Sequence, residues 1–60
     1  MKQIPLSEAK KIIDTREPKG VFYTLETLEN GTYIGIDNRT GDAFTEEFKT
    51  LEKLKEWLAK

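Results

Sequence analysis

Neither cysteine nor histidine occurs among the 60 residues of this chain. A domain of this size buries only about 60% of the surface that its unfolded chain exposes, and disulfides or Cys/His metal sites are common supplements to such a thin core. This chain must therefore fold without disulfides and without a Cys/His metal site. Its size leaves no room for a deep substrate cleft, and the missing His and Cys exclude the common nucleophilic triads. We expect no enzyme, no catalytic residues, no metal and no cofactor.

Hydrophobic residues make up 37% of the chain and charged residues 35%, with a formal net charge of −1. These proportions are typical of a folded domain rather than a disordered segment. No stretch is apolar enough for a secretion signal or a membrane span. We therefore expect a single cytoplasmic domain over residues 1–60.

Both ends of the chain show helical periodicity. Apolar residues at helical spacing predict a helix over residues 6–16, with Ser7 as its N-cap. A second helix is predicted over residues 50–59, with Thr50 as its N-cap and an apolar stripe along one side. Trp57 belongs to that stripe, so we interpret it as a packing residue.

The middle of the chain is rich in β-branched and aromatic residues and is interrupted by two turn sequences. The first is Asn30-Gly31, and the second is the four-residue stretch 38–41. They predict three strands, over residues 21–27, 32–37 and 42–48. The sequence therefore predicts an α+β domain of order α-β-β-β-α, with a three-stranded antiparallel meander packed by helices.

The predicted register sorts the strand residues onto two faces. A two-residue turn at Asn30-Gly31 places Leu25 opposite Ile36, and the second turn places Tyr33 opposite Glu46. One face is then aliphatic, with Val21, Tyr23, Leu25, Ile34 and Ile36. The other face carries aromatic rings and carboxylates, from Phe22, Tyr33, Phe44, Glu26 and Glu46.

Two arrangements of the helices remain open. If both helices cover the aliphatic face, the aromatic and acidic face is exposed and available to a partner. If one helix packs on each face, or if a bulge shifts the register, some of these aromatic residues are packing residues instead.

Residues 21–48 carry six acidic side chains and one basic one. Such a segment repels phosphate backbones and attracts a basic protein surface. We therefore predict a basic protein partner, with Phe22, Tyr33 and Phe44 as anchors and with Glu26 and Glu46 selecting its charge. A homodimer through the same face is an alternative, because small domains can gain core by association.

The C-terminal half resembles the arm-binding domain of phage-type integrases, which consists of three strands and a helix. The resemblance covers Tyr33 to Leu58, including Thr40-Gly41 and Phe48-Lys49-Thr50-Leu51. It implies DNA binding by a basic third strand, but this strand reads Asp42-Ala43-Phe44-Thr45-Glu46-Glu47. We therefore expect a shared topology without a shared function. Nucleic-acid binding by the meander is the alternative to a protein partner, and its only candidate residues are Lys10, Lys11, Arg16 and Arg39. The element order also resembles the double-stranded-RNA-binding domain, whose basic cluster at the last helix is missing here.

The whole chain is most similar to small uncharacterised proteins of phages and prophages in low-GC Gram-positive bacteria. The likeness lies in Tyr33-Ile34-Gly35-Ile36-Asp37-Asn38 and in Thr45-Glu46-Glu47-Phe48. It implies a phage or prophage accessory protein and names no activity.

Overall fold

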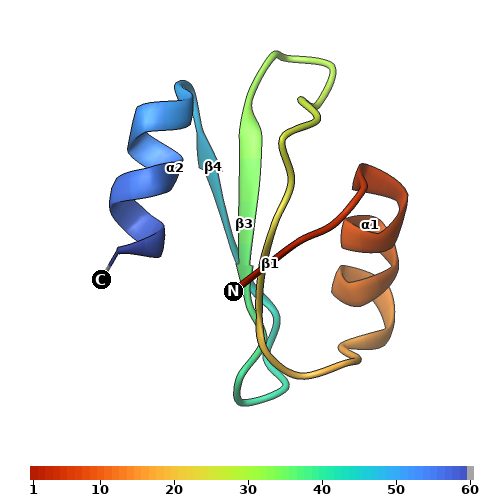
Figure 1. Cartoon of the computed structure of the whole chain (residues 1–60). Coiled ribbons are helices and arrows are strands. Elements are labelled where there is room, and N and C mark those ends of the chain that lie inside the picture. The colour runs from red at the N-terminus through yellow and green to blue at the C-terminus, as the bar shows by residue number, and fades with distance from the viewer. Residues whose placement is uncertain (60) are drawn as a thin grey trace.

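The computed structural model describes residues 1–59. Its elements are β1 (Lys2–Gln3), α1 (Leu6–Thr15), β2 (Val21–Tyr23), β3 (Tyr33–Asp37), β4 (Phe44–Phe48) and α2 (Leu51–Leu58). Figure 1 shows the sheet between the two helices, with α1 on one side and α2 on the other. The predicted α+β class and the order α-β-β-β-α are confirmed. The two-residue strand β1 is an addition that the sequence analysis did not predict.

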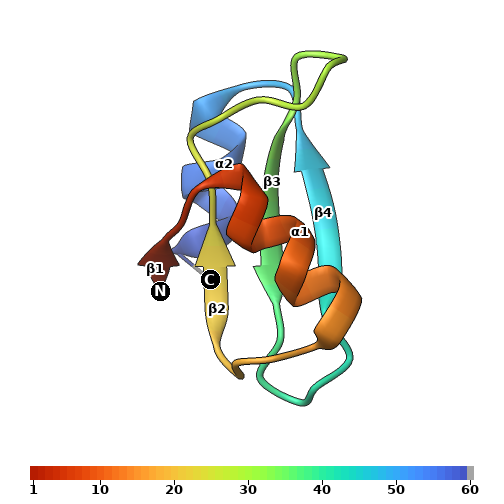
Figure 2. The same cartoon turned by 90° about the vertical axis from the view of Figure 1, so that its right-hand side faces the viewer.

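The four strands form one sheet in the order β1-β2-β3-β4. Strands β2, β3 and β4 make the predicted antiparallel meander, and β1 lies parallel to β2. Parallel neighbours require a crossover connection, which α1 supplies in front of the sheet in Figure 2. No helix within residues 1–59 is both long and apolar enough to span a bilayer.

The register between β2 and β3 differs from the predicted one. Phe22 pairs with Ile36, whereas the prediction placed Leu25 there. The offset is three residues, and because three is odd, each β2 side chain lies on the opposite face from the one predicted. The predicted common face of Val21, Tyr23, Ile34 and Ile36 is therefore wrong.

The connection from β2 to β3 explains this offset. The chain leaves the sheet after Thr24, whose hydroxyl accepts a hydrogen bond from the Glu26 N–H at 2.9 Å. A turn does occur around Asn30-Gly31, but the Leu28 carbonyl closes it by accepting the Gly31 N–H at 2.8 Å. The connection is thus a loop of nine residues, 24–32, rather than a two-residue hairpin.

The register between β3 and β4 is shifted by two residues from the predicted one. Tyr33 lies opposite Phe48, and Gly35 lies opposite Glu46. An even shift leaves every side chain on its predicted face. The turn before β4 contains Gly41 at φ 85° and Ala43 at φ 50°. Both residues lie in the left-handed region, which glycine adopts at no steric cost.

The main core lies between α1 and the sheet. Six buried residues form it, namely Ile4, Ala9, Ile12, Phe22, Ile34 and Ile36. Burial of each isoleucine or phenylalanine side chain among them stabilises the fold by about 2 kcal/mol.

A second apolar layer lies under α2. Leu54 is fully buried, and the ring of Trp57 lies over Gly35 in β3. The Phe48 ring packs against Trp57 in a tilted arrangement, with ring centroids 5.7 Å apart and an interplanar angle of 47°. The Thr50 hydroxyl accepts the Lys53 N–H at 3.2 Å, which confirms the predicted N-cap. The packing role of Trp57 is also confirmed, and the observed arrangement is the one with a helix on each face.

Candidate functional site

Phe22 lies in the core instead of at the predicted exposed face. Its side chain is on the α1 side of the sheet and is only 6% exposed. The odd register offset places it there, beside Ile34 and Ile36. A surface that combines Phe22 with Tyr33 and Phe44 is therefore not formed.

Glu26 lies in the 24–32 loop and caps α1. One of its carboxylate oxygens accepts the Leu6 N–H at 2.6 Å. The N-cap position is occupied by Pro5, which makes no side-chain cap, so the predicted N-cap at Ser7 is wrong. A carboxylate is favourable at the positive end of a helix dipole. Glu26 therefore stabilises α1, and it lies in this loop rather than in a strand beside Glu46.

Tyr33, Phe44 and Glu46 share the α2 side of the sheet, as predicted. Their surroundings differ, because α2 covers only part of this side. Tyr33 is half-buried opposite Phe48, whereas Phe44 is 64% exposed and Glu46 is exposed. The structure thus leaves one aromatic ring and one carboxylate of the predicted set fully available, both in β4.

An ion pair lies next to Phe44. Asp37, which pairs with Phe44 across the sheet, accepts hydrogen bonds from the Arg39 guanidinium at 2.7 and 2.9 Å. The Arg39 backbone N–H also donates to this carboxylate, at 3.2 Å. These donors hold the pKa of Asp37 below its usual value. Asp37 and Arg39 also line a small hollow beside the C-terminal end of α2, together with Met1, Val21, Trp57 and Leu58.

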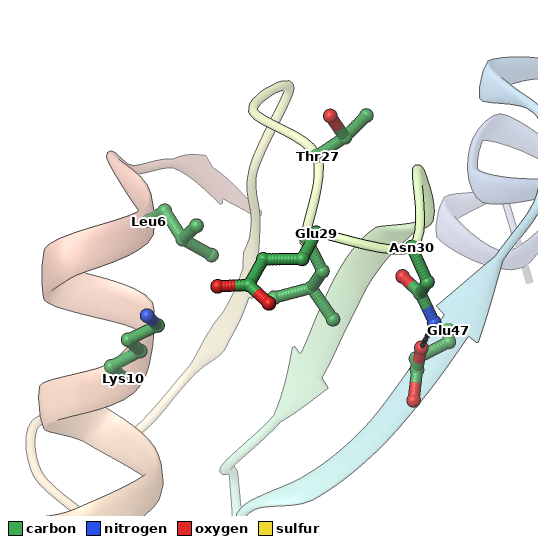
Figure 3. A pocket seen from close by; sticks show the side chains of 7 residues that line it. Leu6, Lys10, Thr27, Glu29, Asn30 and Glu47 are labelled. Carbon is green, nitrogen blue, oxygen red and sulfur yellow. Dashed lines mark hydrogen bonds between the residues drawn. The ribbon is translucent and has the colours of Figure 1, made fainter.

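A second hollow lies on the α1 side, between α1, the 24–32 loop and β4 (Figure 3). Its lining residues are Leu6, Lys10, Thr27, Leu28, Glu29, Asn30 and Glu47. The Glu47 carboxylate accepts hydrogen bonds from the Thr32 hydroxyl at 2.7 Å and from the Asn30 amide at 3.3 Å. These bonds lower the pKa of Glu47 and so favour its negatively charged form on the α1 side of β4.

The two acidic residues of β4 do not belong to a metal cage in the described part of the chain. Within residues 1–59, no three acidic side chains converge closely enough to hold an ion. The side chains of Glu46 and Glu47 point to opposite faces of β4, as alternation requires. The arrangement therefore provides two separate negative charges, one on each side of the same strand.

Asn38 is a buried polar residue that the sequence analysis interpreted only as part of a turn. Its side-chain amide donates to the carbonyls of Arg16 and Pro18, both at 2.9 Å, and its oxygen accepts the Ala43 N–H at 3.0 Å. The residue is completely buried. It joins the end of α1 to the start of β4 and thereby fixes the backbone that presents Phe44.

Family models, curated protein sequences and solved structures were compared with the chain, and none matches it.

Proposed function

We propose that this chain is a non-enzymatic phage or prophage accessory protein that binds a basic protein partner through β4. The contact residues are Phe44 and Glu46, on the part of the α2 side that α2 leaves uncovered. The observation that carries this proposal is the 64% exposure of Phe44 in a sheet whose other strand aromatics are buried or half-buried. Aromatic rings are enriched at the centre of protein interfaces, and charged groups belong to the polar rim around them.

Charge supports a protein partner over a nucleic acid. Asp42, Glu46 and Glu47 are exposed along the turn and strand that an arm-binding domain would insert into a DNA groove. Carboxylates there repel phosphates, whereas they attract lysine and arginine. The resemblance to phage proteins supports a bacterial cytoplasm as the place where the partner is met.

Partner capture by matched variants tests the proposal. Tagged wild-type protein, Phe44→Ser and Leu25→Ser are each incubated with lysate of a low-GC Gram-positive host. Leu25 is the matched control, because it is a large hydrophobic residue, 45% exposed, in the loop instead of in β4. We expect the wild type and Leu25→Ser to retain the same protein and Phe44→Ser to lose it.

Folding of each bait is checked by its thermal unfolding midpoint, which should change little because neither side chain is buried. Equal capture by Phe44→Ser and the wild type would show that Phe44 is not a contact residue.

A further inference from the structure

The backbone of β4 has one unpaired side. In an antiparallel sheet, the N–H and C=O groups of successive residues point alternately to the two neighbouring strands. Thr24 donates its N–H to the Ile34 carbonyl, and Gly20 and Asn38 exchange both of their backbone hydrogen bonds. The backbone groups of Ile34, Ile36 and Asn38 therefore point toward β2. Those of Tyr33, Gly35 and Asp37 point toward β4.

The same alternation orients β4. Phe44, Glu46 and Phe48 lie opposite Asp37, Gly35 and Tyr33, so their backbone groups point toward β3. The N–H and C=O groups of Thr45 and Glu47 must then point away from the sheet. β4 is the last strand of the sheet, and within residues 1–59 no hydrogen bond from a turn, a loop or a side chain reaches any of these four groups. Thr45, Glu46 and Glu47 are all exposed, so this side of β4 is accessible.

We infer that β4 binds an extended, basic segment of a protein, which adds to the sheet as a fifth, antiparallel strand. This inference rests on the proposed function and specifies its partner. Strand addition supplies main-chain hydrogen bonds for affinity, while alternate side chains provide specificity. The outward backbone groups of Thr45 and Glu47 give four hydrogen bonds to such a segment.

The side chains of β4 define the sequence that fits. On the α2 side, Glu46 stands between Phe44 and Phe48, so a lysine or arginine opposite Glu46 is flanked by apolar residues opposite the two rings. On the α1 side, a second basic residue lies opposite Glu47. The complementary segment, in its own direction, is apolar, basic, basic, threonine, apolar.

Charge disfavours a second copy of β4 in the register centred on Glu46. Antiparallel pairing of two copies about Glu46 would place two Glu46 carboxylates directly opposite each other, and like charges in that position are destabilising. A basic segment instead places a positive charge opposite Glu46 and another opposite Glu47.

The test measures the binding of a synthetic peptide that contains Val-Lys-Lys-Thr-Val, by isothermal titration calorimetry. Thr45→Pro removes the outward N–H and places a proline ring on the free side without removing a hydrogen bond to β3. Thr45→Val is the matched control, because both substitutions lose the hydroxyl that donates to the Ala43 carbonyl, and only Pro loses the N–H. Light scattering of each protein alone gives its oligomeric state.

We expect wild type and Thr45→Val to bind the peptide within about twofold of each other, and Thr45→Pro to bind at least about tenfold more weakly. Binding should weaken at high salt, and a peptide with Glu in place of both Lys residues should not bind. Equal binding by Thr45→Pro and the wild type would overturn the inference, as would a wild-type dimer that Thr45→Pro dissolves.

A peptide variant keeps the test decisive if Thr45→Pro does not fold. Methylation of the backbone nitrogens of the residues opposite Thr45 and Glu47 should abolish binding, while methylation of the residues opposite Phe44 and Glu46 should leave the main-chain bonds intact. Equal effects of both methylation patterns would exclude strand addition.

The two proposals can fail separately. If the basic peptide does not bind but lysate capture depends on Phe44, the strand-addition inference is wrong and the proposed function stands. If capture is independent of Phe44, the proposed function itself is wrong.

Discussion

Gly35 lies in the centre of β3, directly under the indole ring of Trp57. A Cβ atom added at Gly35 would lie 2.8 Å from Cε3 and 2.9 Å from Cη2 of Trp57, closer than such atoms approach in proteins. The backbone of Gly35 has no positive φ, so alanine is excluded only by the ring. Overpacking of this kind costs about 1–3 kcal/mol. Replacing a strand glycine otherwise gains about 0.5–1 kcal/mol, because the unfolded chain loses entropy.

We therefore expect Gly35→Ala to lower the free energy of unfolding by about 1–2 kcal/mol in the wild type. In a Trp57→Leu background the ring is gone, and the same change should be neutral or stabilising by about 0.5 kcal/mol. The coupling energy between the two positions should then be about 2 kcal/mol. Urea denaturation of the four proteins measures it, followed by far-ultraviolet circular dichroism because fluorescence is lost with Trp57.

Ile34→Val is the matched control for this cycle. Ile34 is the chain neighbour of Gly35, but its side chain belongs to the core under α1. Its truncation should cost about 1 kcal/mol in both the wild type and the Trp57→Leu background, since it does not contact the ring. If Gly35→Ala and Trp57→Leu are additive within about 0.5 kcal/mol, the packing of α2 on β3 is refuted, and with it the arrangement of one helix on each face.

Two further predictions concern polar side chains that connect distant segments. Asn38→Ala removes the three buried hydrogen bonds to Arg16, Pro18 and Ala43 and should cost about 3 kcal/mol in urea denaturation, out of the roughly 3–9 kcal/mol expected for a domain of this size. A loss below about 1 kcal/mol would show that water replaces these bonds. The folded-state pKa of Glu47 is lowered from its usual 4.5, so its stabilisation is fully present above pH 4.5 and is lost as the pH falls through the folded value. Between about pH 6 and about pH 3 the thermal midpoint of Glu47→Gln should therefore fall less than that of the wild type, and an equal fall would contradict the bonds to Thr32 and Asn30.

The helices and the meander could be predicted because each depends on local patterns. The periodicity of the apolar residues located α1 and α2 to within one or two residues, and the N-cap at Thr50 is a local interaction. Strand β1 escaped prediction because two residues are too few to show alternation. Its place in the sheet comes from pairing with β2, whose partner residues lie twenty positions later in the chain.

The register errors show which part of a sheet a sequence determines weakly. Asn30-Gly31 correctly indicates a turn, but Thr24 already turns the backbone out of the sheet, and no local pattern gives the length of the loop that follows. The observed register differs from the predicted one by an odd number of residues for β2 and by an even number for β4. Phe22 therefore lies on the opposite face from the one predicted, whereas Phe44 and Glu46 lie on their predicted face.

The two long-range polar contacts could not be predicted either. Glu26 caps a helix that begins twenty residues earlier in the chain. The Asn38 amide donates to the carbonyls of Arg16 and Pro18, which lie 22 and 20 residues earlier. Both are residue types that occur commonly on the surface, and only the tertiary fold gives them partners. A useful signal was nevertheless present, because a glycine within a strand often marks the close approach of another group. Gly35 and Trp57 together could have indicated that α2 covers the aromatic face.

The position of α2 also explains why, on the α2 side of the sheet, the exposed aromatic ring belongs to β4. Trp57 and Leu54 need an apolar surface, and Gly35 provides the only flat place in β3 where an indole ring can lie against the backbone. With α2 held there, Tyr33 and Phe48 become partly covered, and Phe44 at the other end of the strand remains open. On the opposite edge, β1 pairs with β2 and covers part of its free side. The unpaired backbone, the exposed ring and the two carboxylates therefore coincide on one strand, and this coincidence is the reason for proposing a strand-forming basic segment rather than a flat aromatic contact.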